Sequence, residues 1–224
     1  MERRKRIALY GGTFDPVHVG HIAVAHGLIE SFELDKVLFI PAHVAPHKRD
    51  TRVSLPLHRY AMLVLATEND DRLRISTVEL EAPERPYTVE TIAHFQREFG
   101  PGVRLFFVMG ADSWSEITTW REWERLLLMT DHIIVTRPRY ELSTANVTPE
   151  IRQRIVDLRG SETENAATLI GESDGTRIYV TDAVFRDVSA TTIRDSISSG
   201  EDIDLLSMVQ PQVAEYIRKY GLYK

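Results

Sequence analysis

The stretch YGGTFDPVHVGHI, residues 10–22, places two glycines, an aspartate, a proline and two histidines in one connection. The residues before it, RIALY, form a short apolar run, and those after it, HIAVAHGLIESF, carry apolar residues at helical spacing. This pattern predicts a buried strand at 6–10 and a helix at 21–32. A connection between a strand and a helix needs only a turn. The residue types in this one therefore indicate a loop that holds a ligand.

The alternation of strand-like and helix-like segments continues along the chain. Apolar runs predict further strands at 36–41, 72–80, 103–109, 131–136 and 177–182. Helical spacing predicts helices at 54–70, with Ser54 as N-cap, and at 88–100 and 118–130. Strands separated by helices imply βαβ units, so we expect an α/β fold with a Rossmann-like parallel sheet flanked by helices. Such sheets bind ligands beyond the carboxyl ends of their strands.

The alternation of predicted strands and helices is interrupted in residues 141–176. A helix is expected within 148–160, with Thr148 as its cap and Pro149 as its first residue, and 161–176 is polar. The segments 189–200, opened by Ser189, and 210–221 are helical in pattern and predict a small C-terminal helical appendage over 189–224. We expect one domain over 1–224, with 141–176 an atypical insertion.

The composition of the chain excludes several classes of protein. The chain has 224 residues, 43% of them hydrophobic and 27% charged, a net charge of −6 and no cysteine. Cysteine-based chemistry is therefore excluded, and a reducing cytoplasm is expected. The negative charge argues against non-specific nucleic-acid binding, and no apolar run is long enough to span a membrane. Five of the eight histidines fall before residue 48, namely His18, His21, His26, His43 and His47.

The residues of the opening loop suit an anion. Gly11 and Gly12 directly follow a strand, where glycine lets a ligand approach the main chain. The amides of Gly12, Thr13 and Phe14 could point at a phosphate, and the N-terminus of the next helix favours negative charge. His18 and His21 are three residues apart and share a helix face, so their rings could hold phosphate oxygens.

Other interpretations of the loop stay open at this point. The dinucleotide fingerprint G-x-G-x-x-G and the Walker loop are both absent. The glycines could form a simple turn, with both histidines in the core or at the surface. His18 and His21 could also bind a metal ion, although no carboxylate or cysteine stands at ligand spacing, so no metal site is assigned.

The loop GGTFDPVHVGH resembles the G-x-F-D-x-x-H-x-G-H signature of the nucleotidyltransferase superfamily. Members transfer a nucleoside monophosphate from a triphosphate to a phosphate-bearing acceptor. The stretch VSATTIRDSI, residues 188–197, resembles the I-S-[SA]-T-x-[IL]-R element of the same superfamily. Its residues suit the role, because Ser189, Thr191 and Thr192 supply hydroxyls and Arg194 a permanently charged fork for phosphate oxygens.

Two further stretches are similar to the bacterial nicotinate-nucleotide adenylyltransferases. PAHVAPHK, residues 41–48, resembles their P-x-x-x-P-P-H-K loop, with Ala45 in place of a proline. The resemblance implies that Lys48 contacts phosphates and that His47 borders the substrate. RPYTVETI resembles their R-x-S-Y-T-x-x-T element, with Pro86 in place of serine. By resemblance Thr88 lies near the pyridine carboxylate, and by its residue type Thr88 is also a good N-cap.

The stretch MGADSWSEITTWREWERLL, residues 109–127, resembles the family's G-x-D region with its paired aromatic residues. Gly110 would again permit close approach, and Asp112 could accept hydrogen bonds from ribose hydroxyls. Trp120 is expected to stack on the pyridine ring, whereas Trp123 is expected in the core.

The segment VTRPRYE resembles the family's R-P-G segment and implies that Arg137 borders adenine. In this chain Arg139 replaces the glycine, which puts the local turn in doubt. The ending LLSMVQPQVAEYIRKYGLYK is also similar to the family's C-terminal helix.

The resemblance implies transfer of AMP from ATP to nicotinate mononucleotide, giving nicotinate adenine dinucleotide and pyrophosphate, a step in making NAD. The implied catalytic residues are His18, His21, Lys48 and Arg194, with Mg²⁺ carried by the triphosphate. The expected partners are ATP and nicotinate mononucleotide, without nucleic acid or membrane. The oligomeric state stays open, a homodimer being one option.

Four alternatives remain at this stage. The acceptor could be nicotinamide mononucleotide or phosphopantetheine. The transfer could also pass through a covalent nucleotidyl-histidine, or the chain could be a nucleotide-binding regulator with an inactive site.

Overall fold

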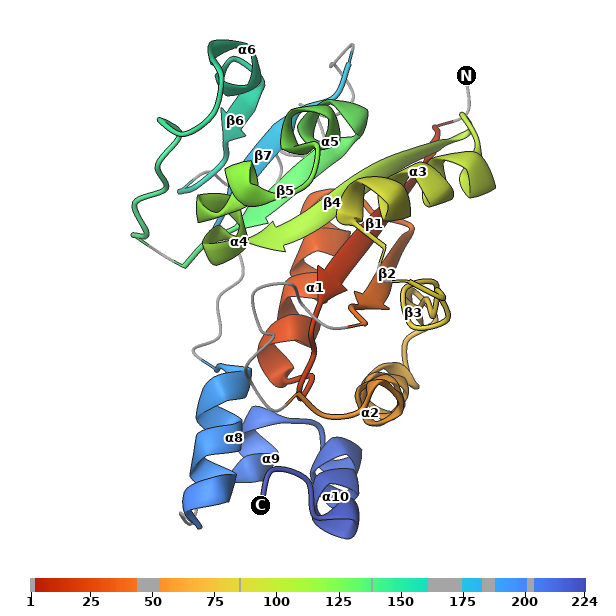
Figure 1. The fold of residues 1–224 in the computed structure, drawn as a ribbon, viewed down its shortest axis with the longest axis vertical. Coiled ribbons are helices and arrows are strands. Elements are labelled where there is room, and N and C mark those ends of the chain that lie inside the picture. Colours follow the sequence, from red (N-terminus) through yellow and green to blue (C-terminus); the bar gives the residue numbers. More distant parts are fainter. Residues whose placement is uncertain are drawn as a thin grey trace.

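Seven parallel strands form one sheet in the order β3-β2-β1-β4-β5-β7-β6 (Figure 1). The structure is a computed structural model that describes residues 3–43, 53–84, 86–137, 139–160, 175–182, 188–200 and 204–224. The strands are β1 (Lys5–Gly12), β2 (Lys36–Pro41), β3 (Leu73–Ile75), β4 (Val103–Gly110), β5 (Asp131–Val135), β6 (Ile155–Asp157) and β7 (Ile178–Thr181). The parallel α/β fold expected from the alternation is confirmed.

The central strands are buried on both faces, which explains their continuous apolar runs. Along β1, Ala8 belongs to one core cluster, while Ile7 and Leu9 belong to the other. Along β4, Phe106 and Phe107 divide in the same way. Successive side chains point to opposite faces of a sheet, so each strand supplies both cores.

Helices cover the two faces. The first core receives side chains from α1 (Val19–Ser31), α2 (Pro56–Thr67), α8 (Ala190–Ser199), α9 (Leu205–Met208) and α10 (Pro211–Tyr220). The second core receives them from α3 (Thr88–Phe99), α4 (Ala111–Ser115), the 3-10 turn η2 (Ile117–Thr119), α5 (Trp123–Met129) and α6 (Pro149–Arg152). The central strands β1 and β4 are therefore covered on both sides.

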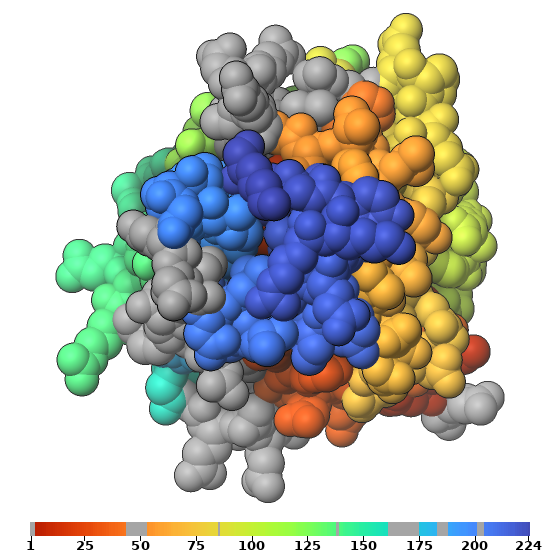
Figure 2. Space-filling view, turned by 90° about the horizontal axis from the view of Figure 1, so that it is seen from below, coloured from red at the N-terminus to blue at the C-terminus, as the bar shows by residue number. Residues whose placement is uncertain are grey.

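The C-terminal helices α8, α9 and α10 gather beyond the carboxyl end of β1, beside α2 (Figure 1). Seen from below, they cover much of that face of the molecule, with the α2 region next to them (Figure 2). The last described segment of the chain therefore lies next to the loop that follows the first strand. None of the described helices is long and apolar enough to cross a membrane.

Two of the predicted caps are confirmed and two are wrong. Ser189 accepts a hydrogen bond from the amide of Thr192 at 3.0 Å, and Thr148 accepts one from that of Ile151 at 3.3 Å. Ser54 is not a cap, because α2 begins at Pro56 after Leu55.

Thr88 is not a cap either, because it is the first residue of α3 and the preceding Tyr87 occupies the N-cap position. The Tyr87 amide donates to the Glu90 carboxylate at 2.8 Å. The backbone amide at the N-cap position of α3 is thus bonded by the Glu90 carboxylate and not by a threonine hydroxyl.

Three predicted elements are shorter than expected. The strand predicted over 72–80 ends at Ile75. The helix predicted over 118–130 begins only at Trp123, since Trp120 has extended backbone and Glu122 lies in the left-handed region with φ 51°. The helix expected within 148–160 is the single turn α6, and the chain then forms the edge strand β6.

Candidate active site

The order of the sheet reverses between β1 and β4, and a cavity of about 220 Å³ opens at this point. Its walls include Tyr10 from β1, Gly110 at the end of β4 and Val135 at the end of β5. Both His18 and His21 line it. Open parallel sheets place ligands at such a reversal, beyond the carboxyl ends of the strands.

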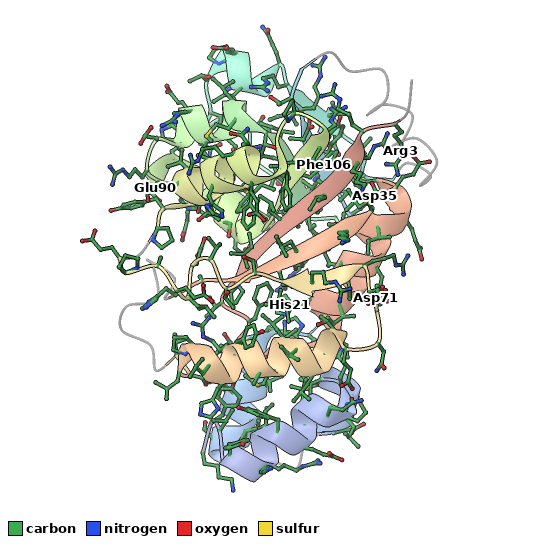
Figure 3. The ribbon with its side chains drawn as sticks, turned by 90° about the vertical axis from the view of Figure 1, so that its right-hand side faces the viewer. Arg3, His21, Asp35, Asp71, Glu90 and Phe106 are labelled. Carbon is green, nitrogen blue, oxygen red and sulfur yellow. The ribbon has the colours of Figure 1, made fainter. Side chains whose placement is uncertain are left out.

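The two histidines form a stacked pair at the start of α1. His18 occupies the N-cap position and His21 lies three residues on, with ring centroids 3.7 Å apart and planes 29° apart. The backbone amide of His18 donates to Nδ1 of His21 at 3.2 Å. Since Nδ1 accepts, the His21 ring carries its proton on Nε2 in this tautomer. Figure 3 shows His21 between the sheet and α2, whereas Arg3 and Asp35 lie at the far end of the strands.

The His18 side chain is buried, and burial lowers its pKa to about 4, so the ring is neutral at pH 7. Its Nδ1 has no hydrogen-bond partner among the described residues. A buried ring nitrogen without a partner is costly in a free protein and available to a ligand that enters the cavity. His18 therefore offers a neutral imidazole group rather than a fixed positive charge.

The glycine loop is shaped by the side chain of Phe14. A Cβ on Gly12 would lie 2.8 Å from Cζ of Phe14, closer than real contacts allow. The Phe14 ring is buried in the first core, and its backbone has φ 51°, in the left-handed region. Phe14 thus fastens the loop to the core, while Gly12 leaves the space that this ring needs.

Asp15, buried at 2% exposure, connects the loop to two distant parts of the chain. Its carboxylate accepts from the Tyr223 hydroxyl at 2.7 Å and from the Ser54 amide at 3.0 Å. Its backbone carbonyl accepts from Nη1 of Arg194 at 2.6 Å. Both carboxylate oxygens are therefore engaged inside the protein.

The second motif lies at the N-terminus of α8, and Arg194 brings it to the first. Ser189 contacts the Thr192 hydroxyl at 2.8 Å, and Nη2 of Arg194 donates to the Thr191 hydroxyl at 3.2 Å. Arginine has five N–H donors, so these contacts leave others for phosphate oxygens. The two motifs at opposite ends of the sequence thus form one site.

The segments that follow β4 and β5 also line the cavity. Gly110 precedes α4, and Asp112 lies exposed in its first turn; both line the cavity, as does Arg137. A Cβ on Gly110 would meet no atom within 4 Å. Arg139 adopts φ 62°, the conformation that glycine favours, so the turn forms despite the substitution.

Thr88 and Trp120 do not line this cavity. Their segments lie side by side, since the Arg121 guanidinium lies 4.5 Å above the Tyr87 ring. Trp120 is half-buried and meets Phe107 edge to face at 6.4 Å between centroids. Two of the residues expected in the site, His47 and Lys48, lie outside the described residues.

Sequence reasoning missed three polar residues that support the site. Arg59 in α2 is completely buried, Tyr223 holds Asp15, and Glu79 accepts from the Thr91 hydroxyl of α3 at 2.8 Å. Burial raises the pKa of Glu79 to about 7. Only Arg59 gives a signal in the sequence, because it stands at helical spacing from the apolar residues Met62 and Leu63.

A Rossmann-like sheet with paired histidines at its reversal point defines a nucleotide-binding α/β protein of the nucleotidyltransferase class. The model of the cytidylyltransferase-like family matches residues 9–196. A "probable nicotinate-nucleotide adenylyltransferase" of Thermoanaerobacter sp. is 35% identical over 224 residues, covering 100% of this chain and 97% of that protein. One of Moorella thermoacetica is 35% identical over 222 residues, covering 99% and 93%. The chain belongs to the cytidylyltransferase-like family and, within it, to the nicotinate-nucleotide adenylyltransferases.

Solved structures agree with this fold. Plasmodium falciparum nicotinic acid mononucleotide adenylyltransferase complexed with NaAD superimposes with a TM-score of 0.68 at 20% identity, covering 98% of this chain and 97% of that one. At this level of identity the likeness concerns the fold.

Proposed function

We propose that the protein transfers AMP from ATP to nicotinate mononucleotide, releasing pyrophosphate and forming nicotinate adenine dinucleotide. The observation that carries the proposal is the stacked pair His18 and His21 at the reversal of the sheet, in a chain similar over its full length to nicotinate-nucleotide adenylyltransferases. The alternatives of a simple turn or a metal site explain neither the cavity nor the link to Arg194.

The reaction makes one bond and breaks one bond at the α-phosphorus of ATP. The phosphate oxygen of the acceptor attacks phosphorus, and the bond to the bridging oxygen of pyrophosphate breaks. The acceptor phosphate is already ionised at neutral pH, so no strong general base is required. Catalysis then consists of positioning and charge stabilisation, which suits a site with neutral imidazoles and a guanidinium.

In this assignment His18 and His21 donate to the transferring phosphate, where negative charge develops. Arg194 holds the β- and γ-phosphates together with Lys48. Three hydroxyls at the start of α8 assist them, those of Ser189, Thr191 and Thr192. The backbone of the loop completes the phosphate cradle with Gly11, Gly12, Thr13 and Phe14.

The remaining assignments concern the two nucleosides. Asp112 accepts from ribose hydroxyls, Gly110 allows the nucleotide to approach the backbone, and Arg137 borders adenine. Thr88, Trp120 and His47 select the pyridine. The adjacency of the Tyr87 and Arg121 side chains supports a common role for the segments that carry Thr88 and Trp120.

Magnesium enters this scheme with ATP as part of the substrate. The described residues contain no group of three metal-ligating side chains, and Asp15 already uses both carboxylate oxygens. The donor set fits an ion held chiefly by triphosphate oxygens, as Mg²⁺ usually is in phosphoryl-transfer sites. Its charge would neutralise the departing pyrophosphate.

The test is pyrophosphate release with ATP and Mg²⁺, with nicotinate mononucleotide, nicotinamide mononucleotide and phosphopantetheine compared as acceptors. We expect strong preference for the first. Preference for the amide would keep the mechanism and overturn the assignment of Thr88 and Trp120. ATP binding without turnover for any acceptor would indicate a regulator.

A second measurement concerns the route of transfer. Direct attack predicts sequential kinetics and no label retained on the denatured protein after incubation with α-labelled ATP. Retained label or ping-pong kinetics would instead indicate a nucleotidyl-histidine intermediate.

A further inference from the structure

Arg59 is a buried arginine whose purpose is not explained by packing. It lies in α2 with no exposed surface, on the side of the helix that carries Met62 and Leu63 into the first core. Among the described residues, no carboxylate oxygen lies within 4.0 Å of its guanidinium, and the buried Asp15 charge stabilises it only from a longer distance. Burying a charge without an ion-pair partner is unfavourable, and an apolar side chain often fills such a place at lower cost.

The guanidinium instead binds three backbone carbonyls from three different segments. Nη1 donates to Thr13 at 2.7 Å, Nη2 to His43 at 2.9 Å and Nε to Ser54 at 3.2 Å. Thr13 is in the glycine loop, His43 follows β2, and Ser54 precedes α2. A planar fork can satisfy three such acceptors at once, whereas the single ammonium group of lysine has no such fixed geometry.

Two hydrogen bonds donated by backbone amides join the same segments. The Ala42 amide donates to the Gly12 carbonyl at 2.9 Å, and the Ser54 amide donates to the Asp15 carboxylate at 3.0 Å. The glycine loop is therefore bonded to this part of the chain at two points, one just after β2 and one just before α2. These amides report directly on whether the three segments stay together.

We propose that Arg59 is a positioning residue that fixes the glycine loop against the chain leaving β2 and entering α2, and so sets the geometry of the phosphate cradle. The inference rests on the proposed function, since the loop matters for catalysis only if it receives the triphosphate. Arg59 is not expected to touch the nucleotide. It acts through the carbonyls of Thr13, His43 and Ser54.

The test compares Arg59→Lys, which keeps the charge and loses the fork, with Arg59→Met, which loses both. In both folded variants kcat and kcat/KM for adenylyl transfer should fall by about 10–100-fold, since misplacement by about 1 Å can cost 10²-fold. Hydrogen exchange at the Ala42 and Ser54 amides should accelerate at least tenfold, while amides of β4 and β5 stay unchanged.

Arg6 supplies a matched control. It is also buried and donates to a backbone carbonyl, that of Phe32 at 2.9 Å, but it lies at the start of β1, about 20 Å of strand away from the loop. Arg6→Lys and Arg6→Met should change thermal stability and leave kcat near the wild-type value.

Three results would overturn the inference. One is an unchanged kcat in folded Arg59→Lys and Arg59→Met, which would make Arg59 a packing residue. Another is full activity in Arg59→Lys with loss only in Arg59→Met, which would make its charge the relevant property. The third is an unchanged rate of hydrogen exchange at the Ala42 and Ser54 amides in the Arg59 variants. That measurement needs no turnover, so it decides the inference even if the wild-type protein transfers AMP to none of the acceptors.

Discussion

The hydroxyl of Tyr223 donates a 2.7 Å hydrogen bond to Oδ1 of Asp15, joining residues 208 positions apart in the sequence. Burial and the neighbouring Asp15 charge raise the pKa of Tyr223 well above its usual range, so the phenol stays protonated and remains a donor. The bond links the C-terminal helical region to the middle of the first motif. It gives the segment that follows α10 a direct contact with the loop that carries the first motif.

Tyr223→Phe should lower the free energy of unfolding by about 1–3 kcal/mol, because a buried carboxylate oxygen loses its donor while the ring still packs. Urea unfolding measures the change. Tyr220→Phe is the control, since that ring is half exposed and close to Tyr216, and it should alter stability by less than 0.5 kcal/mol, as is usual for surface positions. Equal effects of the two variants would show that the bond to Asp15 contributes nothing.

His21→Ala should reduce kcat by about 10²–10³-fold, as removal of a donor to developing oxyanion charge commonly does. The backbone amide of His18 holds His21 in the donor tautomer, so this function depends on both residues. Steady-state kinetics with ATP and nicotinate mononucleotide measure the loss. His94→Ala, an exposed histidine on α3, should retain full turnover. A reduction of less than threefold in His21→Ala contradicts the assigned role.

Two glycines of the site should respond differently to alanine. Gly12→Ala places a methyl group 2.8 Å from the buried Phe14 ring and should cost about 1–3 kcal/mol of stability, as overpacking does. Gly110→Ala meets no atom within 4 Å, so its melting temperature should stay at the wild-type value.

If the nucleotide approaches the backbone at Gly110, however, the added methyl group will raise the KM for ATP by tenfold or more. Calorimetry and kinetics on both variants separate the two effects. An unchanged KM in Gly110→Ala removes this residue from the nucleotide contact.

Glu79 should make stability depend on pH. Its pKa is about 7 in the folded protein and 4.5 in the unfolded chain, so the folded state binds more protons between these values. The contribution of Glu79 to the free energy of unfolding is fully present below pH 4.5 and is lost as the pH rises from 4.5 to 7.

Glu79→Gln keeps an acceptor for Thr91 but does not titrate. Its stability relative to wild type should therefore increase by up to about 3 kcal/mol between pH 4.5 and 7.5. Urea unfolding at four pH values measures this, with Glu124→Gln, an exposed position on α5, as the control. A pH-independent difference between Glu79→Gln and wild type would mean that Glu79 has the same pKa in the folded and unfolded states.

Much of the fold follows from local pattern, because each central strand is an apolar run and each long helix has an apolar face. The boundaries that were wrong depend on contacts that sequence does not display. The Ser54 amide binds Asp15 instead of beginning a helix, and the left-handed Glu122 divides what reads as one helix into two.

The candidate site was predictable to a similar degree. Its motif residues are recognisable one by one, and the sheet topology explains why His18 and Gly110 meet at one cavity. The contacts of Tyr223 and Arg59 were not predictable, because their partners, the Asp15 carboxylate and the Thr13 carbonyl, lie far away in sequence. Long-range polar contacts of this kind leave no periodic pattern in the sequence.

The contacts of Arg194 and Tyr223 with Asp15 have a consequence for synthesis of the protein. The nascent chain emerges from the ribosome with its glycine loop and paired histidines early, and the strands that follow can begin to assemble behind them. Arg194 and Tyr223 are translated 179 and 208 residues after Asp15. Until they leave the exit tunnel, Asp15 lacks two of its donors, so the glycine loop gains its full set of contacts only after the segment that carries Tyr223 has been synthesised.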